Sequence, residues 1–166
     1  AVNDTDSVNE DETVTKTGAQ DDLLNDDTDA DDSSSLSVTN ISHTNGNSGT
    51  VTSSSTYASN GTQIVGTYGT LTVGADGSYT YTADQDAADS IANGSSETDV
   101  FTYTVSDGSA TDTATFTITV NGADNEVAGV NDTGAVDDDS TLSVGNQSAG
   151  VLSNDTDNGS AALSVG

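Results

Sequence analysis

A short acidic stretch, residues 23–38 (LLNDDTDADDSSSLSV), carries the side chains best suited to binding chemistry. Its aspartates crowd into one loop directly after Leu24. Two carboxylates about 5 Å apart repel each other by roughly 0.8 kcal/mol in water, and by several times that near a protein surface. Closing this loop without a cation would therefore be unfavourable. The crowded residues are Asp26, Asp27, Asp29, Asp31 and Asp32.

Calcium is the cation that this loop matches best. It takes about six to eight oxygen ligands, including carboxylates and backbone carbonyls. The alternation Asp27-x-Asp29-x-Asp31 allows three carboxylates to converge on one ion when the loop curls. Zinc prefers His or Cys ligands, and the chain has one His and no Cys. The loop is not an EF-hand, because the sixth and twelfth positions from Asp27 hold Asp32 and Val38 instead of Gly and Glu.

The acidic loop is repeated along the chain. VNDT at residues 2–5 returns at 130–133, and LNDDTD at 24–29 corresponds to LSNDTD at 152–157. Both matches have the same spacing and the same order, which is typical of tandem arrays whose units mainly contact their neighbours.

This spacing predicts one full repeat over residues 1–128 and the N-terminal part of the next repeat over 129–166. The first residues already match the repeat, so we expect the sequence to be a piece of a longer protein.

Further calcium ligands are expected from outside the loop. Asp99 precedes the apolar run VFTYTV and Asp107 follows it, while an Asn-Asp pair opens each repeat, where it could hold an ion between units. For every one of these acids, the alternative interpretation is a solvated surface charge. For Glu10, Asp11 and Glu12, the sequence supports a surface charge and a calcium ligand about equally. The predicted ligands are Asn3, Asp4, Asp26, Asp27, Asp29, Asp31, Asp99, Asp107, Asn131, Asp132, Asp155 and Asp157.

Two hairpins are expected to position these residues. Residues 69–82 alternate apolar side chains with Thr on both sides of a Gly-Ala-Asp-Gly turn, and residues 100–120 do the same around an Asp-Gly turn. The pattern predicts an all-β, Ig-like or cadherin-like β-sandwich. Weaker strands are expected near residues 13–17, 36–42, 49–52 and 63–66, and one short helical turn within 84–96.

Composition argues against order in part of the chain. The chain has 28 Asp and Glu residues against one Lys, and a formal net charge of −27. Leu, Ile, Val and Phe together supply fewer than about a fifth of the residues, which is a signature of disorder. The strand pattern outweighs this signature over residues 63–120 but not over 1–35.

A surface this acidic repels nucleic acid and anionic lipid, and no apolar run is long enough to insert into a membrane.

The hairpin sequences carry a family resemblance. Residues 68–84 and 99–125 resemble the VCBS repeat of very large bacterial surface proteins, and the VNDT opening with residues 23–38 resembles the calcium-binding cadherin-like repeats of the same proteins. The resemblance implies a β-sandwich, calcium at loops and junctions with Asp27, Asp29 and Asp99 among the ligands, and extracellular RTX-type adhesins exported by type I secretion. The Ser run after Asp32 departs from the family, where Gly-Asp is common.

These features favour a structural function over catalysis. We expect a calcium-rigidified extender at the bacterial cell surface, with neighbouring repeats as its partners. The alternative is an adhesive, matrix or filament-forming domain that binds carbohydrate or donates residues 129–166 to a neighbouring molecule. No enzyme is expected: His43 is predicted to lie in a surface loop, Lys16 to be a lone exposed strand residue, and the Thr row over 111–119 to be a solvent-facing strand surface.

Overall fold

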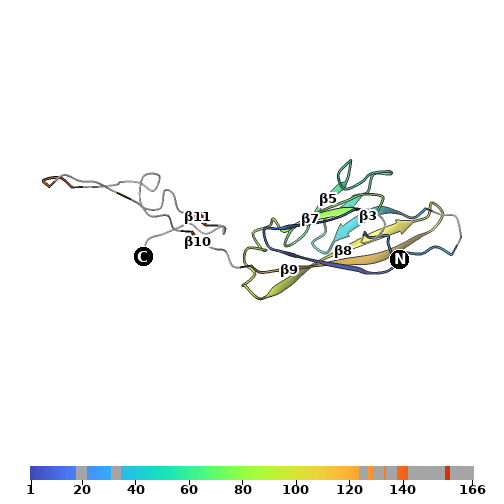
Figure 1. The fold of residues 1–166 in the computed structure, drawn as a ribbon. Helices are drawn as coiled ribbons and strands as arrows, with labels where there is room; N and C mark the ends of the chain where they lie inside the picture. Colours follow the sequence, from blue (N-terminus) through green and yellow to red (C-terminus); the bar gives the residue numbers. More distant parts are fainter. Residues whose placement is uncertain are drawn as a thin grey trace. The chain divides into compact units, whose positions relative to one another are not determined.

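The computed structural model describes residues 1–17, 22–30, 35–123, 127–128, 133, 138–141 and 156–157 (Figure 1). The chain divides into two compact units, residues 1–123 and 124–166, and each is described by itself. In the second unit, β10 (Val127–Ala128) pairs antiparallel with β11 (Thr156–Asp157).

Several sequence predictions fall outside the described residues. The backbone of Asp157 is described, in β11, but its side chain is not. The repeat boundary at residue 128 and the donation of residues 129–166 stay predictions. The predicted ligands outside the described residues are Asp31, Asn131, Asp132 and Asp155.

The first unit consists of two sheets, which confirms the predicted all-β sandwich. One sheet has the strand order β1-β9-β8-β3-β4 and the other β2-β7-β6-β5. The described residues contain no helix; residues 85–91 form two tight turns, in which Ala88 N–H donates to Gln85 O (2.7 Å) and Ile91 N–H to Ala88 O (2.9 Å). The strands are β1 (Asp4–Asn9), β2 (Thr13–Lys16), β3 (Ser37–His43), β4 (Ser48–Thr50), β5 (Thr62–Val65), β6 (Thr70–Val73), β7 (Tyr79–Thr82), β8 (Ser96–Ser106) and β9 (Thr111–Asn121).

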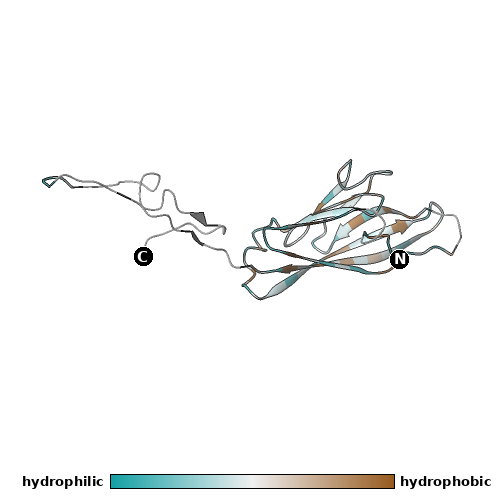
Figure 2. Cartoon of the chain, in the orientation of Figure 1, coloured by the Kyte–Doolittle hydropathy of each residue, from teal (hydrophilic) through white to brown (hydrophobic). Residues whose placement is uncertain are grey.

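The two predicted hairpins form the centre of the sandwich. From Asp99 onward in β8 and from Ala114 onward in β9, every second side chain is buried, and mostly Thr and Ser alternate with them on the outer surface. In β6 and β7, Leu71, Val73, Tyr79 and Tyr81 are buried in the same alternation. Figure 2 shows the hydrophobic positions spaced along the strands and the hydrophilic ones along the loops. The weaker predicted strands are confirmed as β2, β3, β4 and β5, within a few residues of the expected bounds.

Strand β1 contradicts the expectation that residues 1–35 lack an ordered pattern. It pairs in parallel with β9, from Asp4 opposite Phe116 to Asn9 opposite Asn121 (Figure 1). Its partly or fully buried positions hold two acids and one apolar residue, Asp4, Asp6 and Val8, so its sequence shows no hydrophobic alternation. The edge of β9 supplies the hydrogen bonds that order this segment, and no local sequence signal reports them.

Candidate metal site

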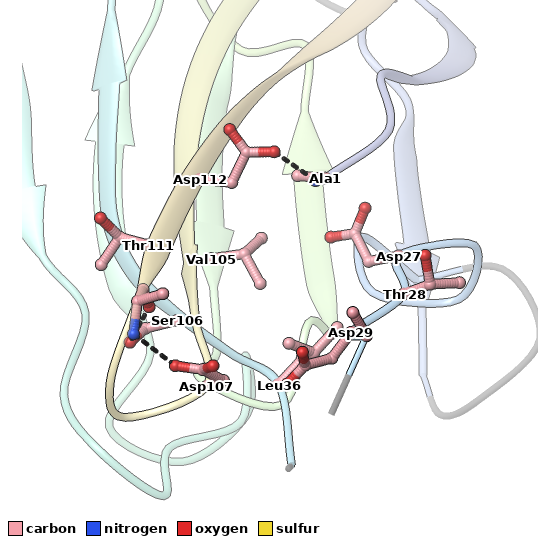
Figure 3. A pocket seen from close by; sticks show the side chains of 12 residues that line it. Ala1, Asp27, Thr28, Asp29, Leu36, Val105, Ser106, Asp107, Thr111 and Asp112 are labelled. Carbon is pink, nitrogen blue, oxygen red and sulfur yellow. Dashed lines mark hydrogen bonds and ion pairs between the residues drawn. The ribbon is translucent and has the colours of Figure 1, made fainter. Parts of the chain in front are cut away.

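One end of the sandwich gathers carboxylates from distant parts of the sequence. We call it the hairpin end, because the β8–β9 turn closes it. Here Asp27 and Asp29, on the loop over residues 22–30, face Asp107 and Asp112 of the hairpin across a hollow of about 150 Å³, which we call the hairpin hollow (Figure 3). Thr28, Ser106, Thr111 and Ala1 also line it, and the ammonium group of Ala1 donates to Oδ2 of Asp112 (2.6 Å).

Asp27 has a carboxylate that the protein satisfies only in part. Its Oδ1 accepts a hydrogen bond from Val2 N–H (2.6 Å), but its Oδ2 is withdrawn from solvent and has no donor. Burial raises the pKa of Asp27, and the carboxylates of Asp26 and Asp112 act in the same direction against the Val2 hydrogen bond. Oδ2 of Asp29 is also withdrawn from solvent. A buried carboxylate oxygen without a donor is costly, so this hollow suits a bound cation.

The hairpin side of the hollow is held in place by the turn itself. Oδ1 of Asp107 accepts hydrogen bonds from Ser109 N–H and Ala110 N–H, both 2.6 Å, and these bonds lower the pKa of Asp107. Asp112 accepts from Thr113 N–H (2.8 Å). The Asp107 carboxylate therefore sits on a fixed turn and the Asp112 carboxylate on the adjoining strand β9, both opposite the acidic loop.

A second hollow, of about 160 Å³, opens at the seam between β1 and the loop; we call it the seam hollow. Asp4, Asp6, Asp22 and Asp26 line it, with Asn25, Thr5, Lys16 and Tyr79. Oδ2 of Asp4 accepts from the Tyr103 hydroxyl (2.6 Å). Burial raises the pKa of Asp4 to about 6, and the nearby carboxylates of Asp26, Asp27 and Asp22 add to the rise against that hydrogen bond.

Lys16 is not the lone exposed residue that the sequence predicts. Its Nζ lies 3.9 Å from Oδ2 of Asp6, which also accepts from the Tyr79 hydroxyl (2.7 Å). The prediction was wrong because β1 brings Asp6 close to β2, and the sequence around Lys16 does not show this contact.

The structure brings most of the described predicted ligands to the hairpin end. Asp4, Asp26, Asp27, Asp29 and Asp107 all line its two hollows. Asn3 is close in sequence, but its Oδ1 accepts from Thr115 N–H (2.9 Å). In the described parts of the chain, no three acidic or His side chains are grouped tightly enough to form a metal site by themselves. An ion here would therefore also need backbone, hydroxyl or water oxygens.

Two residues at this end were missed by sequence reasoning. Asp22 is 6% exposed, with Oδ1 accepting from Leu24 N–H (3.1 Å), and Asp112 faces Asp27 across the hairpin hollow. Asp22 lies before the repeated motif, and Asp112 looks like an ordinary strand residue. The only signal available was the general crowding of acids.

Asp99 is separate from both hollows. It is fully buried in β8, and its carboxylate accepts from five donors on both sheets and on the β5–β6 turn. Gly66 makes the approach of this turn possible, since a Cβ there would lie 2.3 Å from Asp99 Oδ2. Calcium ligation by Asp99 stays a prediction, and protein donors already occupy its carboxylate. They are Thr67 N–H (2.9 Å), Tyr68 N–H (3.1 Å), Gly69 N–H (3.2 Å), the Tyr81 hydroxyl (2.7 Å) and His43 Nε2 (2.9 Å).

The prediction that His43 lies in a surface loop is wrong. His43 ends β3 at a buried position and packs its ring 4.8 Å from that of Phe101. Its Nδ1 accepts from Asn45 N–H (3.1 Å), so Nε2 carries the proton that is donated to Asp99. The polar residues that follow it in sequence disguised this inward position.

The comparisons with known proteins agree with this fold. No curated protein sequence matches the chain significantly. None of the described residues forms a helix that is long and apolar enough to cross a bilayer. The family model of the bacterial cadherin-like domain matches residues 1–122, nearly the whole first unit, and the chain therefore belongs to the bacterial cadherin-like domain family.

Proposed function

We propose that this chain is a calcium-stabilised structural repeat of a large secreted bacterial adhesin, of the VCBS type, which folds and stiffens when it meets extracellular calcium. Membership of the bacterial cadherin-like family supports an extracellular adhesive role, and domains of this family are generally structural and not enzymatic. The observation that carries the calcium part is the buried Oδ2 of Asp27, which has no donor in a hollow lined by further carboxylates.

Charge balance supports an ion taken from outside the chain. The whole chain has one Lys and no Arg, against 28 acidic residues. At the seam hollow, repulsion between carboxylates contributes to the raised pKa of Asp4. A divalent cation would remove this repulsion, and calcium prefers carboxylate oxygens such as those of the acids that line these hollows. Asp27 and Asp29 would hold the ion from the loop, and Asp107 and Asp112 from the hairpin.

The position of the hairpin hollow explains how an ion would stiffen the repeat. The loop that carries Asp27 lies between β2 of one sheet and β3 of the other, and Asp107 belongs to the hairpin of the larger sheet. One ion bound across the hollow would tie the loop to that hairpin. Calcium at about 100 times its Kd would add about 2.7 kcal/mol to the free energy of unfolding for each site. Neighbouring repeats of the same protein are the proposed partners.

Thermal unfolding with and without calcium tests this proposal. We expect millimolar calcium to raise the melting temperature of the chain relative to EDTA, and magnesium to raise it much less. Asp27→Asn should reduce the calcium shift while leaving the melting temperature in EDTA nearly unchanged. Asp86→Asn, at an exposed position away from the hairpin hollow, is the matched control and should keep the full shift. A melting temperature that calcium does not change would overturn the proposal.

A further inference from the structure

The sequence contains five Asn-Gly pairs, and this dipeptide can react with itself. Asparagine is chemically labile, because the backbone nitrogen of the next residue can attack its side-chain amide. Glycine hinders this attack least, since it has no Cβ. The fold decides whether the two groups can meet. The pairs begin at Asn45, Asn60, Asn93, Asn121 and Asn158, and the last pair lies outside the described residues.

The first pair is held by hydrogen bonds in the β3–β4 turn. Nδ2 of Asn45 donates to Val65 O (3.0 Å), and its Oδ1 accepts from Asn47 N–H (2.9 Å). The N–H of Gly46 donates to His43 O (3.0 Å). Both the amide and the nitrogen that would attack it are therefore engaged.

The second and fourth pairs are restrained at their glycines by neighbouring carbonyl groups. A Cβ on Gly61 would lie 2.8 Å from Tyr57 O. A Cβ on Gly122 would lie 2.4 Å from Ala92 O, and Gly122 N–H also donates to Ser95 O (3.0 Å). Turning either glycine toward the preceding side chain would therefore disturb close packing or break a hydrogen bond.

The third pair lies in an open turn just before β8. Asn93 is exposed, and Ser95 N–H donates to Ala92 O (2.8 Å) across the turn. Gly94 has a φ of +79°, as in the third position of a type II turn, and a Cβ there would meet nothing within 4 Å. Among the described residues, no group accepts from Gly94 N–H or bonds to the Asn93 amide. This pair alone combines exposure with two unengaged reacting groups in the described parts of the chain.

We propose that Asn93 is a site of spontaneous deamidation in the folded protein. The backbone nitrogen of Gly94 attacks Cγ of Asn93 and forms a bond to it. The bond from Cγ to Nδ2 breaks, and Nδ2 leaves as ammonia with the proton of the Gly94 N–H. Solvent water then opens the cyclic imide at one of its two carbonyl carbons. One opening gives aspartate, and the other gives isoaspartate, whose backbone runs through Cβ and Cγ.

The reaction would act on the end of the first unit. Ser95 closes the turn and also accepts from Gly122 N–H, just after β9. Isoaspartate lengthens the backbone of the turn by one atom, and either product adds a carboxylate to a chain with a net charge of −27. The bonds of Ser95 should therefore weaken, close to residue 123, where the unit ends. This inference does not depend on the proposed calcium binding.

Peptide mapping of the full chain, aged at mildly alkaline pH, tests the site. Cleavage before aspartate releases residues 89–98, whose only asparagine is Asn93, and residues 112–123, whose only asparagine is Asn121. We expect the first peptide to gain about 1 Da, partly as isoaspartate. It should do so about tenfold faster than the second, which needs a local opening of the fold before it reacts. Equal rates for the two peptides in the folded chain would overturn the inference.

Three further arms separate the fold from the dipeptide itself. In concentrated urea the two peptides should react at similar rates, because no fold restrains either pair; a tenfold difference that persists there would contradict the structural explanation. Gly94→Ala should slow the reaction about tenfold, since a Cβ hinders the attack, and an unchanged rate would overturn the mechanism. Asn93→Gln is the matched control: its peptide should keep its mass, because the longer side chain closes the ring far more slowly. Hydrogen exchange at Gly122 N–H should become faster on ageing in the unmodified chain and not in Asn93→Gln, and equal exchange in both would overturn the predicted weakening.

Discussion

Asp99 and Asp27 are both acids in a chain with almost no basic residues, yet their surroundings are opposite. The buried carboxylate of Asp99 accepts from five donors, three of them backbone N–H groups of the β5–β6 turn. Asp27 accepts from one donor on Oδ1 and from none on Oδ2. One acid is satisfied by the protein itself, while the other leaves part of its charge unbalanced.

This difference separates two uses of acid in one fold. Preorganised dipoles from Thr67, Tyr68 and Gly69 point at Asp99 and make its charge a link between the two sheets that needs no ion. The acids of the hairpin end lie near one another, so their charge opposes folding unless a cation binds them. Stability should therefore have a part that does not depend on calcium, centred on Asp99, and a part that does.

The largest effect is expected from Asp99→Ala. Removing the carboxylate leaves buried donors without an acceptor, among them His43 and Tyr81, and we expect a loss of about 3–5 kcal/mol in the free energy of unfolding. Urea unfolding measures it, and the loss should be the same in EDTA and in calcium. Asp86→Ala, at an exposed position, should change stability by less than about 0.5 kcal/mol.

Calcium dependence in that experiment would reverse the comparison. If Asp99→Ala lowered the free energy of unfolding only in the presence of calcium, Asp99 would be a metal ligand, as its position before the VFTYTV run predicts. Equal losses in both conditions would assign it to the fold alone.

The hairpins could be predicted from sequence, and β1 could not, for one physical reason. In β6 to β9 every buried position is apolar or small, with the exception of Asp99, so the alternation is visible. In β1 two of the inward positions are Asp4 and Asp6, which are satisfied by tyrosine hydroxyl groups from other strands. Such partners are separated from β1 by tens of residues. A single sequence does not show them.

The candidate site, like the strands of the fold, could be predicted from the sequence only in part. Local crowding identified the loop with Asp27 and Asp29. The β8–β9 hairpin meets this loop at the hairpin hollow, and Asp4, which parallel pairing places opposite Phe116 of β9, meets it at the seam hollow. The surroundings of Asp99 and Asp27 were not predictable, because they depend on which backbone groups approach each carboxylate. Burial with donors and burial without donors look identical in sequence.

Tyr103→Phe tests the comparison between acids within the hairpin end. The Tyr103 hydroxyl donates to Asp4, so its loss should cost about 1–2 kcal/mol without calcium. Tyr79→Phe is the matched control: it removes the corresponding donor from Asp6, which still has Lys16 at 3.9 Å. Chemical unfolding in EDTA should show the larger loss for Tyr103→Phe. Equal losses would mean that Lys16, beside Asp6, does not contribute to the free energy of unfolding at this end.

The smallest effect is a pH dependence that comes from Asp4. Its pKa in the fold is raised to about 6 from an ordinary value of 3.8, chiefly by burial. Between these values the folded chain holds more protons than the unfolded chain, so its stability should fall as pH rises through this window and level off above it. Because Asp4 is only half-buried, we expect a change of about 1 kcal/mol.

Melting temperatures across this window, measured in EDTA, test the sign. The unmodified chain should be most stable near the acidic limit of the window, and Asp4→Asn should remove most of the trend. Asp27, whose pKa is also raised, adds to it, while Asp107 and Asp112, whose pKa values are lowered, contribute only below the window. Calcium should reverse the trend, because protons and the ion compete for the same carboxylates. A falling trend that persists unchanged in saturating calcium would show that no ion reaches Asp4, and would confine calcium to the hairpin hollow.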